Sequence, residues 1–102
     1  MHESSPEPLV IAHHAKDGAI EGGYAYGHGF TIVWPNTAKG IRGAWITSIL
    51  RAVIARLEVH QQTEFACTEN QQALSFLYAA VEILDSRIKD RKQRGVLGTR
   101  EP

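Results

Sequence analysis

Cysteine, net charge and long apolar runs are scarce in this sequence, and each scarcity excludes a class of protein. The 102 residues include one cysteine, Cys67, so neither an internal disulfide nor a cysteine-rich metal site is possible. Eleven basic side chains balance eleven acidic ones, which argues against a nucleic-acid polymer or a membrane surface as partner. The longest apolar stretch, 44–57, is interrupted by two arginines and is too short to span a bilayer. We therefore expect a soluble globular protein that works inside a cell.

The residue patterns of common catalytic sites are also missing. A phosphate-binding loop, a Ser-His-Asp arrangement and a suitably spaced carboxylate pair are absent from the sequence. The glycines between Gly22 and Gly29 lack the spacing of a dinucleotide fingerprint, and hairpin turns explain them adequately. His13 and His14 are adjacent, so on a strand they point to opposite faces and complete no metal site. These absences predict a protein that is not an enzyme and that uses no metal or cofactor.

The N-terminal part of the chain has the composition of a small sheet. Residues 1–8 are acidic and contain proline, and we expect a flexible tail there. Within 9–40, the segments 9–14 and 30–34 are rich in strand-forming residues, and Lys-Asp-Gly at 16–18 supplies a turn. Tyrosines alternate with small residues between the glycines that separate these segments, which suits a twisted hairpin. The sequence therefore predicts that 9–40 forms a small antiparallel sheet.

From residue 44 onward the apolar residues recur at helical spacing. A first helix is indicated by Ile46, Ile49, Leu50, Val53, Ile54 and Leu57. A second helix is predicted to begin with a capping box, because Gln71 follows Thr68 at the required interval. Its apolar stripe consists of Leu74, Leu77, Tyr78, Val81, Leu84 and Ile88. Gly95 is a natural end for this helix, since it can adopt the left-handed conformation.

The predicted fold is therefore a single α+β domain, 1–102, in which a small N-terminal antiparallel sheet precedes a long C-terminal helical hairpin, 44–95. Two helices cover only one stripe of each other. Further apolar side chains are expected outside that contact, namely Trp45, Ile54, Tyr78 and Ile83. Association of hairpins into a bundle is the usual way to cover such surface, so we expect a homo-oligomer.

A basic cluster near the end of the second helix allows two interpretations. It consists of Arg87, Lys89, Arg91, Lys92 and Arg94. These charges can simply stay in solvent and complement the helix dipole. Alternatively, Arg87 and Arg91, one turn apart, can bind phosphate groups.

Asn70 is similarly open to two roles, as a capping-turn residue or as an amide that hydrogen-bonds an edge of a base. Asn70 and Arg87 are 17 residues apart, about 25 Å along one helix, so a small ligand that touches both must lie between two protomers.

Two segments of the C-terminal half resemble a known family. Residues 65–74, FACTENQQAL, resemble its signature FAC-x-EN-x-x-AL, and residues 87–99 resemble its ending R-x-x-DR-x-x-RGV-x-GT. Residues 29–32 and 53–57 are also similar, so that the resemblance covers about residues 27–99; it is specific in the C-terminal half and loose before Ile41. The family is the first Thoeris anti-defence family of phages, whose helical hairpin is shared with anti-CBASS sponges.

The resemblance implies a sponge that binds and sequesters a cyclic ADP-ribose isomer in the host bacterial cytoplasm without degrading it, and that in some members also holds cyclic di- or trinucleotides. It also implies a dimer or hexamer with pockets between protomers. The matching positions are His60, Asn70, Arg87 and Arg91, which would supply an aromatic stack, an amide and two phosphate ligands. His60 departs from the pattern, because a larger aromatic is expected there.

Three alternatives remain open at this stage. A structural or assembly hairpin protein of a phage would need only the oligomer and would use the arginines for solubility. A nucleic-acid-binding module would need the arginine row to follow phosphates, which a net charge of zero does not favour. An enzyme that cleaves the signal is the third alternative.

Overall fold

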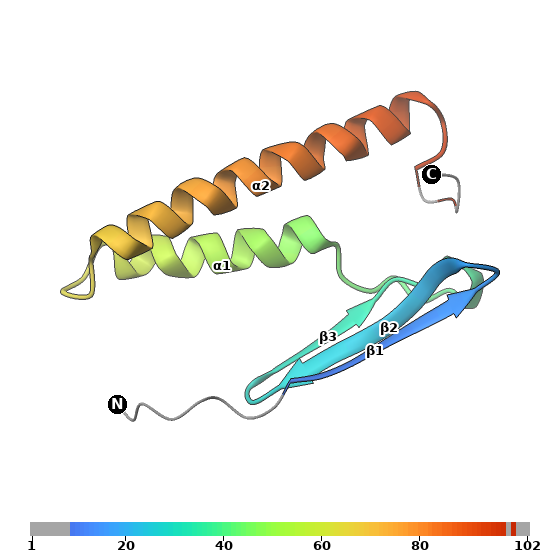
Figure 1. Cartoon of the computed structure of the whole chain (residues 1–102), viewed down its shortest axis with the longest axis horizontal. Coiled ribbons are helices and arrows are strands. Elements are labelled where there is room, and N and C mark those ends of the chain that lie inside the picture. The colour runs from blue at the N-terminus through green and yellow to red at the C-terminus, as the bar shows by residue number, and fades with distance from the viewer. Residues whose placement is uncertain (1–8, 98, 100–102) are drawn as a thin grey trace. The chain divides into compact units, whose positions relative to one another are not determined.

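The computed structural model describes residues 9–97 and 99, and these form two compact units. The sheet unit contains the described residues up to Trp45, and the helical unit begins at Ile46 (Figure 1). A three-stranded antiparallel sheet followed by two helices confirms the α+β class. The flexible tail expected at 1–8 lies outside the described residues, and the assignment of 1–102 to one domain stays a prediction.

The sheet unit is a meander of strands in the order β1-β2-β3, with β1 at Val10–Lys16, β2 at Ala19–Gly27 and β3 at Phe30–Trp34. Asp17 and Gly18 join β1 to β2 with φ values of 53° and 79°. Two consecutive positive φ values define the hairpin turn that matches the twist of the strands, and the Asp-Gly pair is among the sequences that favour it. The turn and both predicted strands are confirmed.

A bulge in β2 explains the paired glycines Gly22 and Gly23. Between two paired positions, β2 has two residues, Glu21 and Gly22, where β1 has only His14. The register of the two strands therefore shifts here. Gly23 has a φ of 129°, and a Cβ atom at this position would lie 2.2 Å from the carbonyl oxygen of Ala12. No other residue type fits there without moving the backbone of β1.

The helical unit contains α1, Ile46–His60, and α2, Thr68–Gln93, which run antiparallel and are joined by a loop at 61–67 (Figure 1). The predicted hairpin is confirmed, although α1 starts at residue 46 rather than 44. Its core contains the buried residues Ile54, Leu74 and Val81, against which Leu50, Leu57 and Leu77 pack. The expectation that Ile54 lies outside the helix contact is wrong, since this side chain is 5% exposed. Within the described part of the chain, neither helix is long and apolar enough to cross a membrane.

Both ends of α2 are capped, but the first cap differs from the prediction. Cys67 is the N-cap residue, and its Sγ accepts a hydrogen bond from the backbone N–H of Asn70 at 3.4 Å. The capping box predicted at Thr68 is therefore wrong by one residue. At the other end, Gly95 has a φ of 75°, the N–H of Val96 donates to Arg91 O at 3.0 Å, and that of Gly95 donates to Lys92 O at 3.1 Å. These two bonds form a Schellman motif, which confirms the predicted end of the helix.

Candidate ligand-binding site

Asn70 lies at the tip of the hairpin, where its side chain closes the loop between the helices. Its Nδ2 donates to Gln61 Oε1 at 3.1 Å and to the carbonyl oxygen of Phe65 at 3.1 Å. Gln61 in turn bonds both backbone groups of Cys67, accepting from N at 3.0 Å and donating to O at 3.1 Å. This network fixes the orientation of the half-buried Asn70 amide. Sequence reasoning missed Gln61, because its partners are backbone atoms that only the folded loop brings near.

His60 belongs to the same tip. It is the last residue of α1, and its ring centroid lies 6.3 Å from that of Phe65, with the planes tilted by 48°. Phe65 is 67% exposed although it is a large apolar side chain. The tip therefore presents two rings beside one amide, a combination suited to contacting a flat heterocycle. Phe65 was quoted in the sequence only as part of a motif, and its exposure is what marks it as a possible contact.

The predicted basic residues lie at the opposite end of α2, and some of them have structural roles. Nη2 of the half-buried Arg91 donates to the carbonyl oxygens of Val96 and Thr99, each at 3.1 Å. Arg94 forms an ion pair with Asp90 at 3.0 Å. The two bonds of Arg91 tie its guanidinium to the residues that follow α2. These bonds hold Arg91 in place, while Arg87, one turn earlier, has an exposed side chain.

The four predicted residues thus form two groups within one chain. His60 and Asn70 flank the loop, whereas Arg87 and Arg91 occupy successive turns far along α2. The helix is continuous between Asn70 and Arg87, which confirms the roughly 25 Å separation expected from helical rise. A single hairpin does not bring an amide and an arginine from these two groups onto one small ligand.

One side of the hairpin is crossed by polar bridges. Arg51 of α1 forms an ion pair with Asp85 of α2 at 2.6 Å, and the Tyr78 hydroxyl donates a hydrogen bond to the Glu58 carboxylate. This hydrogen bond, together with desolvation and the negative charge of Glu58, raises the pKa of Tyr78 above its ordinary value. The bridging residues of each helix are seven positions apart, which places both bridges on the same side.

The other side of the hairpin is apolar apart from the exposed Arg56, and we call it the apolar face. The apolar face consists of Ile46, Ile49 and Val53 of α1 and Phe76, Ala80 and Ile83 of α2. Helical geometry directs these side chains away from the two polar bridges. Phe76 and Ile83 are 76% and 69% exposed. His60 continues the row on α1 and Arg87 continues the row on α2, so the two candidate groups lie at opposite ends of one apolar surface.

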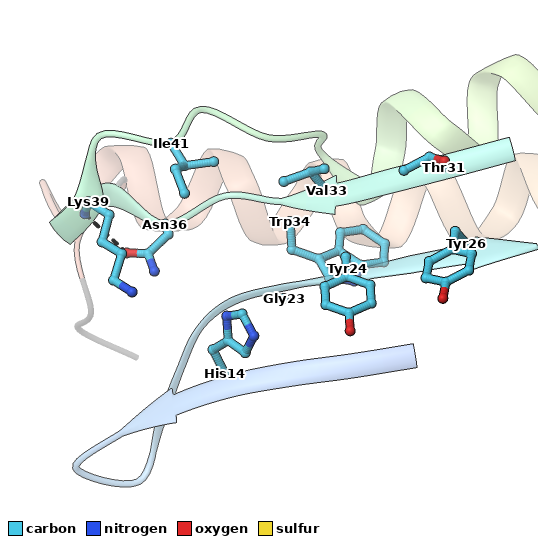
Figure 2. A pocket seen from close by; sticks show the side chains of 10 residues that line it. All are labelled: His14, Gly23, Tyr24, Tyr26, Thr31, Val33, Trp34, Asn36, Lys39 and Ile41. Carbon is cyan, nitrogen blue, oxygen red and sulfur yellow. Dashed lines mark hydrogen bonds between the residues drawn. The ribbon is translucent and has the colours of Figure 1, made fainter. Parts of the chain in front are cut away.

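The sheet unit has a separate hollow of about 400 Å³, shown in Figure 2. Tyr24 and Tyr26 of β2 stand side by side in it, with ring centroids 5.8 Å apart and planes 19° from parallel. His14 of β1 meets Tyr24 edge-on, with a centroid distance of 6.3 Å. The remaining lining residues are Gly23, Thr31, Val33, Trp34, Asn36, Lys39 and Ile41. The hollow could accommodate an apolar or flat group; sequence reasoning missed it, although the Tyr-x-Tyr alternation was a signal.

Comparison with known proteins relates part of this chain to one phage protein. The chain is 40% identical over 67 residues to a protein of Bacillus phage SBSphiJ7 that is named Thoeris anti-defense 1. The match covers 66% of the chain and 47% of the relative, so the chain spans about half the length of that protein. No family model matches the sequence. The relationship confirms the resemblance that the motifs of the C-terminal half indicated.

Proposed function

Starting from this relationship to a phage anti-Thoeris protein, we propose that the chain counters Thoeris defence by sequestering its signal. In this proposal it acts in the host bacterial cytoplasm as a sponge for a cyclic ADP-ribose isomer, which it binds without cleaving. Cyclic di- and trinucleotides, the signals of CBASS defence, are further candidate ligands.

The observation that carries the proposal is the arrangement of the apolar face. Two hairpins that pack antiparallel through this face cover Phe76 and Ile83 of both chains. The same pairing places the tip of one hairpin, with Asn70, beside Arg87 and Arg91 of its partner. The 25 Å that separate the groups within a chain are thereby bridged between chains. A homodimer, or a hexamer built from such dimers, would thus have two equivalent pockets per pair of hairpins.

The residues of such a pocket suit a cyclic nucleotide that contains a diphosphate. The rings of His60 and Phe65 offer a stacking surface for the base. The amide of Asn70 can recognise an edge of the base. Arginine forks bind phosphate oxygens in pairs, and Arg91 is already held in position by the C-terminal turn.

The proposal is tested first by native mass spectrometry of the protein purified from cells with an active TIR sensor. We expect a dimer or hexamer that carries the mass of an intact cyclic ADP-ribose isomer, released unchanged on heating. Arg87→Ala should weaken binding by about 2 kcal/mol, the scale of a charge-assisted contact to phosphate. Lys89→Ala is the matched control, because it removes one exposed charge from the same part of α2. Normal binding by Arg87→Ala would place the ligand elsewhere.

The division of the pocket between chains is tested by mixing two inactive variants. Asn70→Ala and Arg87→Ala should each lose binding as homo-oligomers. Co-refolded mixtures should recover part of it, since some pairings contain one complete pocket. Failure to recover binding, with mixing verified by mass, would show that the pocket lies within one chain.

A structural hairpin protein without a small ligand is the alternative that one observation favours. Arg91 stabilises the C-terminal turn of its own chain, a role that requires no ligand. In that case the protein would assemble through the apolar face but show no thermal shift with any candidate signal.

A further inference from the structure

We propose that Asn70 offers the ligand a hydrogen-bond acceptor only, and that Gln61 is the positioning residue that enforces this polarity. The site would then select a signal whose base carries a free amino group. The inference rests on the proposed function and specifies the chemistry that the tip of the hairpin recognises.

The geometry of the Asn70 amide leaves one orientation. Its nitrogen carries two hydrogens, and two oxygens, Gln61 Oε1 and Phe65 O, each lie 3.1 Å from that nitrogen. Turning the amide over would bring Oδ1 against both acceptors, so that two hydrogen bonds would become two repulsive contacts. Asn70 Oδ1 itself has no hydrogen-bond partner among residues 9–97 and 99.

Gln61 cannot turn over either. Its Oε1 accepts from the N–H of Cys67 and its Nε2 donates to the carbonyl oxygen of the same residue, at 3.0 and 3.1 Å. A backbone N–H and a backbone C=O have fixed polarities, so they determine which end of the Gln61 amide is oxygen. That oxygen then determines which end of Asn70 is nitrogen. The polarity offered to the ligand is therefore set by the backbone of Cys67 and transmitted through one side chain.

An acceptor at this position distinguishes an amino group from a carbonyl oxygen. The exocyclic amino group of adenine can donate to Asn70 Oδ1. Hypoxanthine has an oxygen at the same place, and two acceptors would then face each other. An unsatisfied polar group in a binding site costs about 1–3 kcal/mol, and 1.4 kcal/mol corresponds to tenfold in affinity. We therefore expect a preference of about fivefold or more for the amino form.

The experiment compares two ligands by calorimetric titration of the full chain. One is a cyclic ADP-ribose whose ring is closed through a ribose hydroxyl, which leaves the adenine amino group free; the other is its hypoxanthine counterpart. Gln61→Leu removes the group that orients Asn70 and should reduce the affinity ratio, because it leaves Phe65 O alone to hold the amide. Gln61→Glu keeps an acceptor for Asn70 and Cys67 N–H and should retain the preference, although it lowers stability because its second oxygen faces Cys67 O. Gln62→Leu, at the neighbouring exposed glutamine, is the control.

Each outcome is decisive. Equal affinity of the wild-type protein for the two ligands would overturn the inference and leave the proposed function intact. Binding of neither ligand would overturn the cyclic ADP-ribose part of the proposed function and this inference with it. An unchanged ratio in Gln61→Leu would refute the role of Gln61. Should Gln61→Leu fail to fold, the wild-type ratio still decides the polarity of Asn70, and loss of the preference in Gln61→Glu would refute the role of Gln61.

Discussion

Replacing Arg91 with alanine should destabilise the protein as well as weaken ligand binding, unlike replacement of an ordinary helix-end cation. The half-buried guanidinium donates from Nη2 to two carbonyl oxygens of the C-terminal turn. Val96 O also accepts from the N–H of Thr99 at 3.0 Å, so it stays satisfied in the variant. Thr99 O lies on an exposed residue, where water can replace the lost donor. The two bonds should therefore be worth about 1 kcal/mol together, less than charged hydrogen bonds contribute in a buried site.

This magnitude is accessible to two measurements. A loss of about 1 kcal/mol should lower the melting temperature by roughly 4–8 °C in a domain of this size. Amide hydrogen exchange should accelerate at residues 95–97 and 99 and remain unchanged in the middle of α2, because the turn opens without the helix.

Two matched variants separate the contacts of Arg91 from its charge. Lys92→Ala removes a positive charge from the same last turn of α2 and should cost only a few tenths of a kcal/mol through the helix dipole. Arg91→Lys keeps the charge but lacks the planar fork, so its stability should be intermediate. If Arg91→Ala proved no less stable than Lys92→Ala, the bonds to the turn would contribute nothing and the reasoning would be refuted.

Three further outcomes are expected from other parts of the chain. Gly23→Ala should destabilise the sheet unit by about 1–3 kcal/mol in denaturant titrations, because its Cβ would meet the backbone of Ala12; an unaffected variant would contradict the bulge geometry. Ile83→Glu should shift the protein to monomer in sedimentation experiments, since it places a charge in the apolar face, and an intact oligomer would exclude that face as the interface. Because the pKa of Tyr78 is raised, the stabilisation from its bond to Glu58 is present below the ordinary tyrosine pKa of about 10 and lost as pH rises through the folded-state value. Absorbance titration should show that the ionisation of Tyr78 moves to lower pH in Glu58→Gln; no change would refute the bond.

Local sequence patterns predicted the elements because the signals for them are local. Apolar spacing predicted both helices, the Asp-Gly pair at 17–18 predicted the first hairpin turn, and Gly95 predicted the end of α2. The N-cap was misplaced because threonine is a more common capping residue than cysteine. Only the folded loop shows that Cys67, and not Thr68, has the extended backbone of an N-cap. Ile54 was expected outside the helix contact because the spacing of apolar residues shows how wide the apolar stripe of a helix is. It does not show which part of that stripe faces the partner helix.

The candidate site was only partly predictable for a different reason. Asn70, Arg87 and Arg91 were named as candidates from the sequence, and His60 from the family resemblance. In the structure they lie in two groups on one hairpin, and their roles in binding stay predictions. The roles of Gln61 and of the Arg91 contacts depend on backbone oxygens and N–H groups, which have no residue-type signature. Such partners become visible only when the loop and the C-terminal turn are folded.

The small core of the hairpin has a consequence for the abundance of the protein. Three side chains form its buried centre, and none among the described residues is less than 2% exposed. If folding is completed by pairing through the apolar face, stability must rise with concentration by mass action. At low concentration, newly translated chains would be unpaired and open to proteolysis. Once their concentration is high enough for pairing, they would resist it. Dilution should therefore shorten the lifetime of the protein in a protease digest, and a threshold of expression would separate cells in which the protein persists from those in which it does not.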